Sequence, residues 1–141
     1  MNETQWRYET GRARVPLFRL AQAEEALEDA RILLGRARLQ GAVNRLYYAC
    51  FYAVTALLFS ERHAAARHKS LLLLFDRHWV GTARVPREMG RFFHRIFERR
   101  QRGDYGEKAA FQRGDVAAWL AETETFVARI SNEIDRTLRK G

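Results

Sequence analysis

Residues 41–60 read GAVNRLYYACFYAVTALLFS, and this stretch decides the fold. It contains no proline, and its single glycine stands at the first position. Alanine and leucine are frequent, and the length suits a helix of about five turns. Because such a helix would be apolar on nearly all sides, other helices or a second subunit should bury it. We therefore expect residues 41–60 to form the central helix of the domain.

The polar side chains of this helix gather on one side. At about 100° per residue, four of them project together and form what we call the tyrosine stripe, namely Asn44, Arg45, Tyr48 and Tyr52. Polar groups on a buried helix need hydrogen-bonding partners or must line a cleft. The tyrosine stripe is therefore the first candidate for a functional surface.

The rest of the chain shows further amphipathic helices around the central one. Apolar residues recur at helical spacing from Pro16 to Gly35 or Gly41, and again over 71–80, 86–102 and 115–138. Residues 1–15 lack this period and are expected to be a flexible N-terminal arm. The sequence thus predicts an all-α fold, an antiparallel bundle of about five helices, with residues 16–141 forming a single domain.

Composition limits the classes of protein to consider. The polar residues of the central helix, three tyrosines among them, argue against a membrane span, and the N-terminus lacks the pattern of a secretory signal. We therefore expect a cytoplasmic protein without a membrane partner. The four histidines and the lone Cys50 do not show metal-ligand spacing, so we expect no metal and no cofactor.

The net charge of +8 makes RNA or DNA a candidate partner, although an arginine-rich genome would produce the same bias. On the predicted helix 86–102, arginines gather on the side opposite the phenylalanines, and Arg84 projects the same way just before it. Guanidinium groups in a row can hold phosphates by forked hydrogen bonds, whereas the alternative is an ordinary solvated face. The residues predicted to bind nucleic acid are Arg87, Arg91, Arg95, Arg99 and Arg102.

Arg100 is the exception on this helix, because it projects into the phenylalanine side. A charge directed at a core needs a specific partner. Asp104 is one candidate partner, and the tyrosine stripe of the central helix is the other. The alternative is that the last turn frays and Arg100 reaches solvent. If the first interpretation holds, the tyrosine stripe, Arg100 and the turn at Asp104 and Tyr105 share one site.

Three motifs together carry a family resemblance. They are Asn44-Arg45-x-Tyr47-Tyr48-Ala49, Arg67-His68-Lys69 and Arg100-x-x-x-Asp104-Tyr105-Gly106. Their combination resembles the HEPN domains, and most of all the small stand-alone prokaryotic members. The resemblance implies an antiparallel helical bundle that forms a homodimer and is often encoded beside a minimal nucleotidyltransferase as a toxin and antitoxin pair. It also implies ribonuclease activity without metal, since many members have it.

The chain departs from the ribonuclease members at one position. Those members carry an arginine followed after four to six residues by a histidine, and Arg100 takes the arginine's place, but residues 101–107 contain no histidine. Asp104 and Tyr105 stand where the imidazole is expected, and neither exchanges protons near neutral pH as readily as imidazole does. His68 matches a histidine of the resembling proteins, and we expect it to bond loop backbone, with a catalytic role as the alternative.

Three hypotheses follow. The first is a HEPN-like interaction module of a toxin–antitoxin or nucleotidyltransferase-associated system that meets RNA or nucleotide. The second is an endoribonuclease with an altered site of Arg100, Asp104 and Tyr105. The third is a non-catalytic helical dimer whose arginines only face solvent. A variant of the first makes Tyr105 the target of nucleotide transfer by the partner enzyme, as the resemblance implies.

Overall fold

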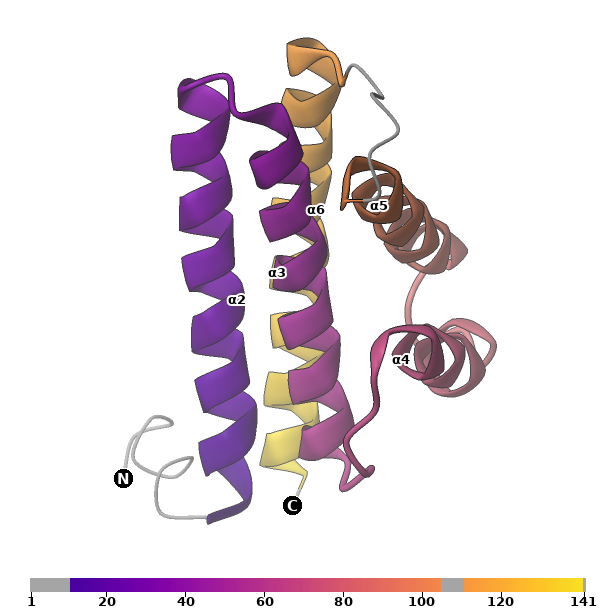
Figure 1. The fold of residues 1–141 in the computed structure, drawn as a ribbon. Helices are drawn as coiled ribbons and strands as arrows, with labels where there is room; N and C mark the ends of the chain where they lie inside the picture. The colour runs from indigo at the N-terminus through magenta and orange to yellow at the C-terminus, as the bar shows by residue number, and fades with distance from the viewer. Residues whose placement is uncertain (1–10, 105–110, 141) are drawn as a thin grey trace.

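A computed structural model describes residues 11–104 and 111–140 of the chain as a bundle of helices. Three long helices lie side by side: α2 (Gly11–Gly35), α3 (Leu39–Ser60) and α6 (Arg113–Arg139). The shorter α4 (His68–Phe75) continues directly into a π-helical turn, η1 (Asp76–Val80), and α5 (Arg87–Asp104) follows. Figure 1 shows α4 and α5 packed on one flank of the long helices. The predicted all-α antiparallel bundle is confirmed.

The central position of α3 is the main organising feature. It packs against α2, α6 and α5, and α2 runs antiparallel to it, as Figure 1 shows. Its core side chains are fully buried, among them Leu46, Cys50, Val54 and Leu57. Among the described residues one helix, α3, is long and apolar enough to cross a membrane, but 67% of that segment is buried inside the bundle. Its hydrophobicity is thus used to build the protein core.

Two predicted boundaries need correction. Residues 11–15, assigned to a flexible arm, form the first turn of α2 instead. Pro16 is therefore inside the helix and not at its start, and the fully buried Ala13 explains why the helix extends past it, since packing outweighs the hydrogen bond that proline cannot donate. The predicted helix 71–80 begins earlier, at His68, and changes to π-helical geometry at Asp76.

Candidate functional site

The end of α5 is tied to the start of α3. The Gln40 side-chain amide donates a 2.6 Å hydrogen bond to the Gly103 carbonyl. Gly103 is buried, and a Cβ there would lie 3.2 Å from the Gln40 side chain and 3.3 Å from the Phe111 ring. The missing side chain therefore lets α5 approach α3 closely. This contact sets the direction of Arg100, which lies one turn earlier on α5.

Arg100 lies over two aromatic rings of α3. Its guanidinium carbon is 5.1 Å from the ring centre of Tyr47 and 5.2 Å from that of Tyr48, within the range of cation–π attraction. The expectation that Arg100 faces the tyrosine stripe is confirmed as geometry. The alternative of a frayed last turn is wrong, because Arg100 is half-buried and α5 continues to Asp104.

His68, the first residue of α4, completes this group. Its Nδ1 atom is 2.8 Å from the Tyr47 hydroxyl, and its ring packs 5.3 Å from that of Phe51. The predicted bond from His68 to loop backbone is thus replaced by one to a tyrosine. We call Arg100, Tyr47, Tyr48 and His68 the Arg100 cluster. It joins side chains from α3, α4 and α5.

Burial and the neighbouring charges favour the neutral forms of Tyr47 and His68 in this cluster. Burial raises the pKa of Tyr47, and the charge of Arg100 only partly opposes this. Burial lowers the pKa of His68, and the charges of Arg100 and Arg67 lower it further. A neutral imidazole can accept a proton, which a protonated one cannot. The hydrogen bond to Tyr47 fixes the ring and leaves Nε2 as the second nitrogen for a ligand.

The tyrosine stripe is continuous with the cluster. The Asn44 side-chain oxygen accepts hydrogen bonds from Nε and Nη2 of Arg45, at 3.1 and 2.8 Å. The Arg45 guanidinium in turn lies 4.9 Å from the ring centre of Tyr48, and the Tyr52 ring packs 5.8 Å from the same ring. The structure therefore brings all four stripe residues together with Arg100 and His68. Their functional role stays a prediction.

The positions of the other two predicted catalytic side chains, Asp104 and Tyr105, are not described by the structure. Asp104 is the last residue of α5, but its side chain lies outside the described part of the structure, and so does the whole of Tyr105. Sequence reasoning also missed Tyr47 as a member of the cluster. The adjacent tyrosines Tyr47 and Tyr48 were the available signal, since a cation above one of two neighbouring rings can reach both.

The predicted arginine surface divides into separate environments. Arg99 leaves it, because its guanidinium stacks 3.9 Å from the ring centre of Trp119 on α6, and burial lowers its pKa. Arg102 is exposed near the end of α5. Three of the predicted residues remain together and line a pocket of about 460 Å³ beside η1, namely Arg87, Arg91 and Arg95.

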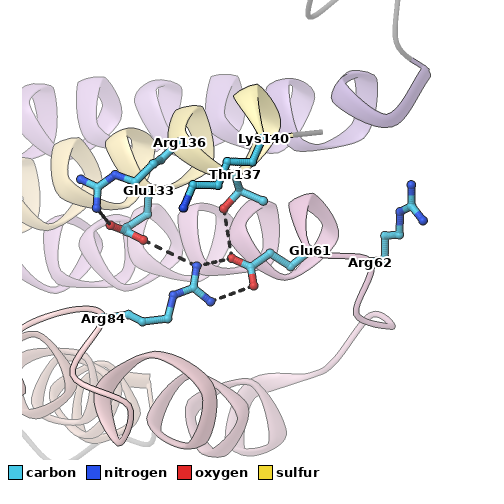
Figure 2. A pocket seen from close by; sticks show the side chains of 7 residues that line it. All are labelled: Glu61, Arg62, Arg84, Glu133, Arg136, Thr137 and Lys140. Carbon is cyan, nitrogen blue, oxygen red and sulfur yellow. Dashed lines mark hydrogen bonds and ion pairs between the residues drawn. The ribbon is translucent and has the colours of Figure 1, made fainter.

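Arg84 does not continue this surface, because it precedes α5 and turns toward the ends of α3 and α6. Its guanidinium bonds both carboxylate oxygens of Glu61, with Nη1 2.8 Å from Oε1, and lies 3.6 Å from Glu133. Thr137 also donates to Glu61, at 3.1 Å. Figure 2 shows these groups converging in one pocket, with Arg62 pointing away from the network. We call this the charged pocket, and its volume is about 730 Å³.

The ion pairs of the charged pocket hold separate segments of the bundle together. Both α3 and α6 end here, and helix C-termini favour cations. Glu133 is buried, with 5% of its side chain exposed, and it also pairs with Arg136 at 3.1 Å. Burial acts to raise the pKa of Glu61, but the hydrogen bond and charge of Arg84 outweigh it, so the pKa is lowered. The pocket thus joins three distant segments by paired charges.

Metal ligation is not indicated in the part of the chain that the structure describes. There, no three histidine, cysteine, aspartate or glutamate side chains are grouped so as to hold a metal ion. Cys50 is fully buried in α3, and burial raises the pKa of its thiol, which keeps it protonated and unreactive.

Comparison with known proteins agrees with this architecture. Residues 17–134 match the model of the HEPN domain. The chain is 42% identical to a UPF0332 protein of Thermotoga maritima over 114 residues, which is 81% of this chain and 86% of that relative. It is also 28% identical over 116 residues to a putative toxin of Methanocaldococcus jannaschii, covering 82% of this chain and 86% of the relative. A second putative toxin of that organism is 24% identical over 123 residues, covering 86% and 84%.

Proposed function

Because this chain belongs to the HEPN domain family, we propose that it is a toxin-type HEPN module that acts on RNA through the Arg100 cluster. One observation carries the proposal: the Arg100 guanidinium lies over Tyr47 and Tyr48, beside His68. Two relatives bear the name putative toxin, which supports the toxin part of the proposal.

The chemistry of the cluster suits a nucleic acid. A guanidinium binds phosphate oxygens by charge-assisted hydrogen bonds, and aromatic rings held beside it can stack on bases. Tyr48 is half-buried, so part of its ring is exposed, and Arg45, 4.9 Å from the centre of that ring, adds a second cation. A single-stranded RNA would thus find a cation, a partly exposed ring and an imidazole within one cluster.

The test measures RNA binding and growth arrest by the full chain and its Arg100→Ala variant. We expect the variant to bind a fluorescent single-stranded RNA at least tenfold more weakly and to lose growth arrest when expressed in bacteria. Arg36→Ala is the matched control, because Arg36 is exposed in the turn after α2 and its removal changes the net charge equally. Equal binding by the Arg100 and Arg36 variants would refute the proposal.

A second candidate, a metal-independent endoribonuclease, is favoured by the position of His68. No histidine follows Arg100 in the sequence, but His68 lies near Arg100 in the fold. Burial lowers the pKa of His68, and the charge of Arg100 lowers it further. When Nδ1 donates to the Tyr47 hydroxyl, Nε2 can take the proton of an RNA 2′-hydroxyl as its oxygen attacks the adjacent phosphorus. Arg100 would stabilise the charge on the phosphate, and the leaving 5′-oxygen would take a proton from water.

The ribonuclease candidate is tested with purified chain and mixed cellular RNA in the presence of a metal chelator. We expect cleavage products with 2′,3′-cyclic phosphate ends, and loss of cleavage in His68→Asn. His78→Asn is the control, since His78 packs beside His63 and Trp79, away from the Arg100 cluster. Cleavage that survives His68→Asn unchanged would leave the binding proposal standing and remove the catalytic one.

The proposal includes a homodimer and a minimal nucleotidyltransferase partner. If the partner neutralises the toxin, its co-expression should restore growth, and mass spectrometry of the recovered chain should locate any nucleotide on Tyr105. If growth is restored while Tyr105 stays unmodified, the partner neutralises the toxin by binding it and not by transferring a nucleotide to Tyr105.

A further inference from the structure

A second pocket is built where η1 meets α5 at Gly90. A Cβ at Gly90 would lie 3.0 Å from a Val80 methyl and 3.1 Å from the Asp76 carboxylate, so a larger residue would have to push these two side chains away. Asp76 opens the π-helical turn, a rare geometry that is frequent at functional sites. The close approach places the Asp76 carboxylate directly against the α5 backbone.

Asp76 holds a histidine at the edge of this pocket. Oδ2 of Asp76 lies 2.6 Å from Nε2 of His94, one turn beyond Gly90. The side chains are 37% and 44% exposed, and ion pairs as exposed as this contribute little to stability. The bond fixes the orientation of a solvent-accessible imidazole whose Nδ1 can contact a ligand. His94 and Arg100 point about 120° apart on α5, so this is a different side of the helix.

Three cations line the same pocket. Arg87, Arg91 and Arg95 follow one another at intervals of four residues, and with Asp76 and His94 they surround about 460 Å³. Like charges at this spacing repel one another on a helix. In the described part of the chain no ion pair with a carboxylate holds any of the three. An anion in the pocket would relieve this repulsion.

We infer that this His94 pocket binds the phosphodiester backbone of an RNA strand, at a surface separate from the Arg100 cluster. The three arginines rise about 6 Å from one to the next, so each can contact a successive phosphate. Apart from the His94 imidazole, no aromatic side chain is among the described residues that line the pocket, and its contacts would therefore mainly position the strand by its phosphates. This inference rests on the proposed action on RNA and adds a positioning surface to it.

The four histidines of the chain allow both surfaces to be followed in one experiment. The full chain is titrated with a ten-nucleotide oligouridine while the imidazole resonances are recorded by NMR, with His94→Gln and His68→Gln used for assignment. His68 reports on the Arg100 cluster, and His94 reports on the pocket. We expect the His94 resonance to move, and we expect Arg91→Ala to weaken its titration at least fivefold, with a shallower salt dependence.

Arg36→Ala is the charge-matched control and should leave the titration unchanged. Gly90→Ala, which pushes Asp76 away from α5, should weaken the His94 response in protein whose helix content by circular dichroism is unaltered. If the His68 resonance moves to saturation and the His94 resonance does not, the His94 pocket does not bind RNA, although the proposed function of the Arg100 cluster still stands. A His94 response that is equal in the Arg91 and Arg36 variants would overturn it too.

Discussion

Arg84 and Arg100 each join three segments of the bundle, and the contacts described for the two side chains differ in kind. Arg84 meets the carboxylates of Glu61 and Glu133, and its pKa is raised, mainly by the hydrogen bond to Glu61. Arg100 lies on the rings of Tyr47 and Tyr48. A carboxylate attracts a cation by its opposite charge, whereas an aromatic ring attracts it through the negative face of its π-system.

The difference shows in the neighbouring titratable groups. At Arg84, attraction lowers the pKa of Glu61 and favours the carboxylate. At Arg100, repulsion adds to burial and lowers the pKa of His68, which favours the neutral imidazole. The first arrangement stabilises the fold by pairing charges. The second holds an uncharged proton acceptor beside a cation, which is the arrangement that the proposed RNA cleavage would use.

The largest effect on stability should come from the charged pocket. Arg84→Ala removes a partner from Glu133, whose side chain is only 5% exposed. We expect a loss of about 2–3 kcal/mol in the free energy of unfolding, below the value for a fully buried pair because Arg136 still contacts Glu133. Urea denaturation at pH 7 measures it.

Arg62→Ala is the matched control for that measurement. Arg62 lines the same pocket but points away from the network in Figure 2. Its removal should change the unfolding free energy by at most about 0.5 kcal/mol, the scale of a cation near a helix C-terminus. If both variants lose the same amount, the carboxylate pairing is not what stabilises this end of the bundle.

A smaller effect is expected in the Arg100 cluster. Tyr47→Phe keeps the ring beneath Arg100 and removes only the hydroxyl that bonds His68, so it should cost about 1 kcal/mol of stability. The same variant should loosen the imidazole and reduce RNA cleavage. Tyr52→Phe serves as control, because Tyr52 contacts Tyr48 by its ring. If the Tyr47→Phe protein keeps its stability and its His68 resonances, the hydrogen bond between Tyr47 and His68 does not hold the imidazole in place.

The sequence predicted the parts of the fold that depend on regular periodicity. The composition of residues 41–60 identified α3, and the helical period placed Arg100 toward that helix, because neither inference needs knowledge of distant contacts. Tyr47 was missed because consecutive residues project about 100° apart, so a stripe centred on Tyr48 excludes it. The guanidinium is large enough to span both rings.

The charged pocket and the His94 pocket could not be predicted in this way. Glu61, Arg84 and Glu133 come from three separate segments, and only the assembled bundle brings them together. Asp76 and His94 lie on two different helices, η1 and α5, and a wheel of either helix alone does not show that they meet. Proline at residue 86 was the one available signal that Arg84 lies outside α5, since helices usually end or begin near it.

The smallest predicted effects separate the two regions by pH. Glu61 has a lowered pKa in the folded chain, so its contribution to stability is present above its unfolded pKa of about 4.3 and is lost as the pH falls through the folded value. His68 also has a lowered pKa, but as a base it binds its proton first in the unfolded chain. Its contribution is therefore lost as the pH falls below about 6.5.

Denaturation curves collected between about pH 8 and pH 3 should show these two windows in different variants. His68→Gln should flatten the decline in unfolding free energy below about pH 6.5 while leaving the acid limb unchanged. Glu61→Gln should flatten only the limb below about pH 4.3, because His68 is unchanged in that variant. If His68→Gln left the upper window as steep as in the unmodified chain, the imidazole would not be held neutral by burial and Arg100. The distinction between the carboxylate contacts of Arg84 and the aromatic contacts of Arg100 would then fail at its functional end.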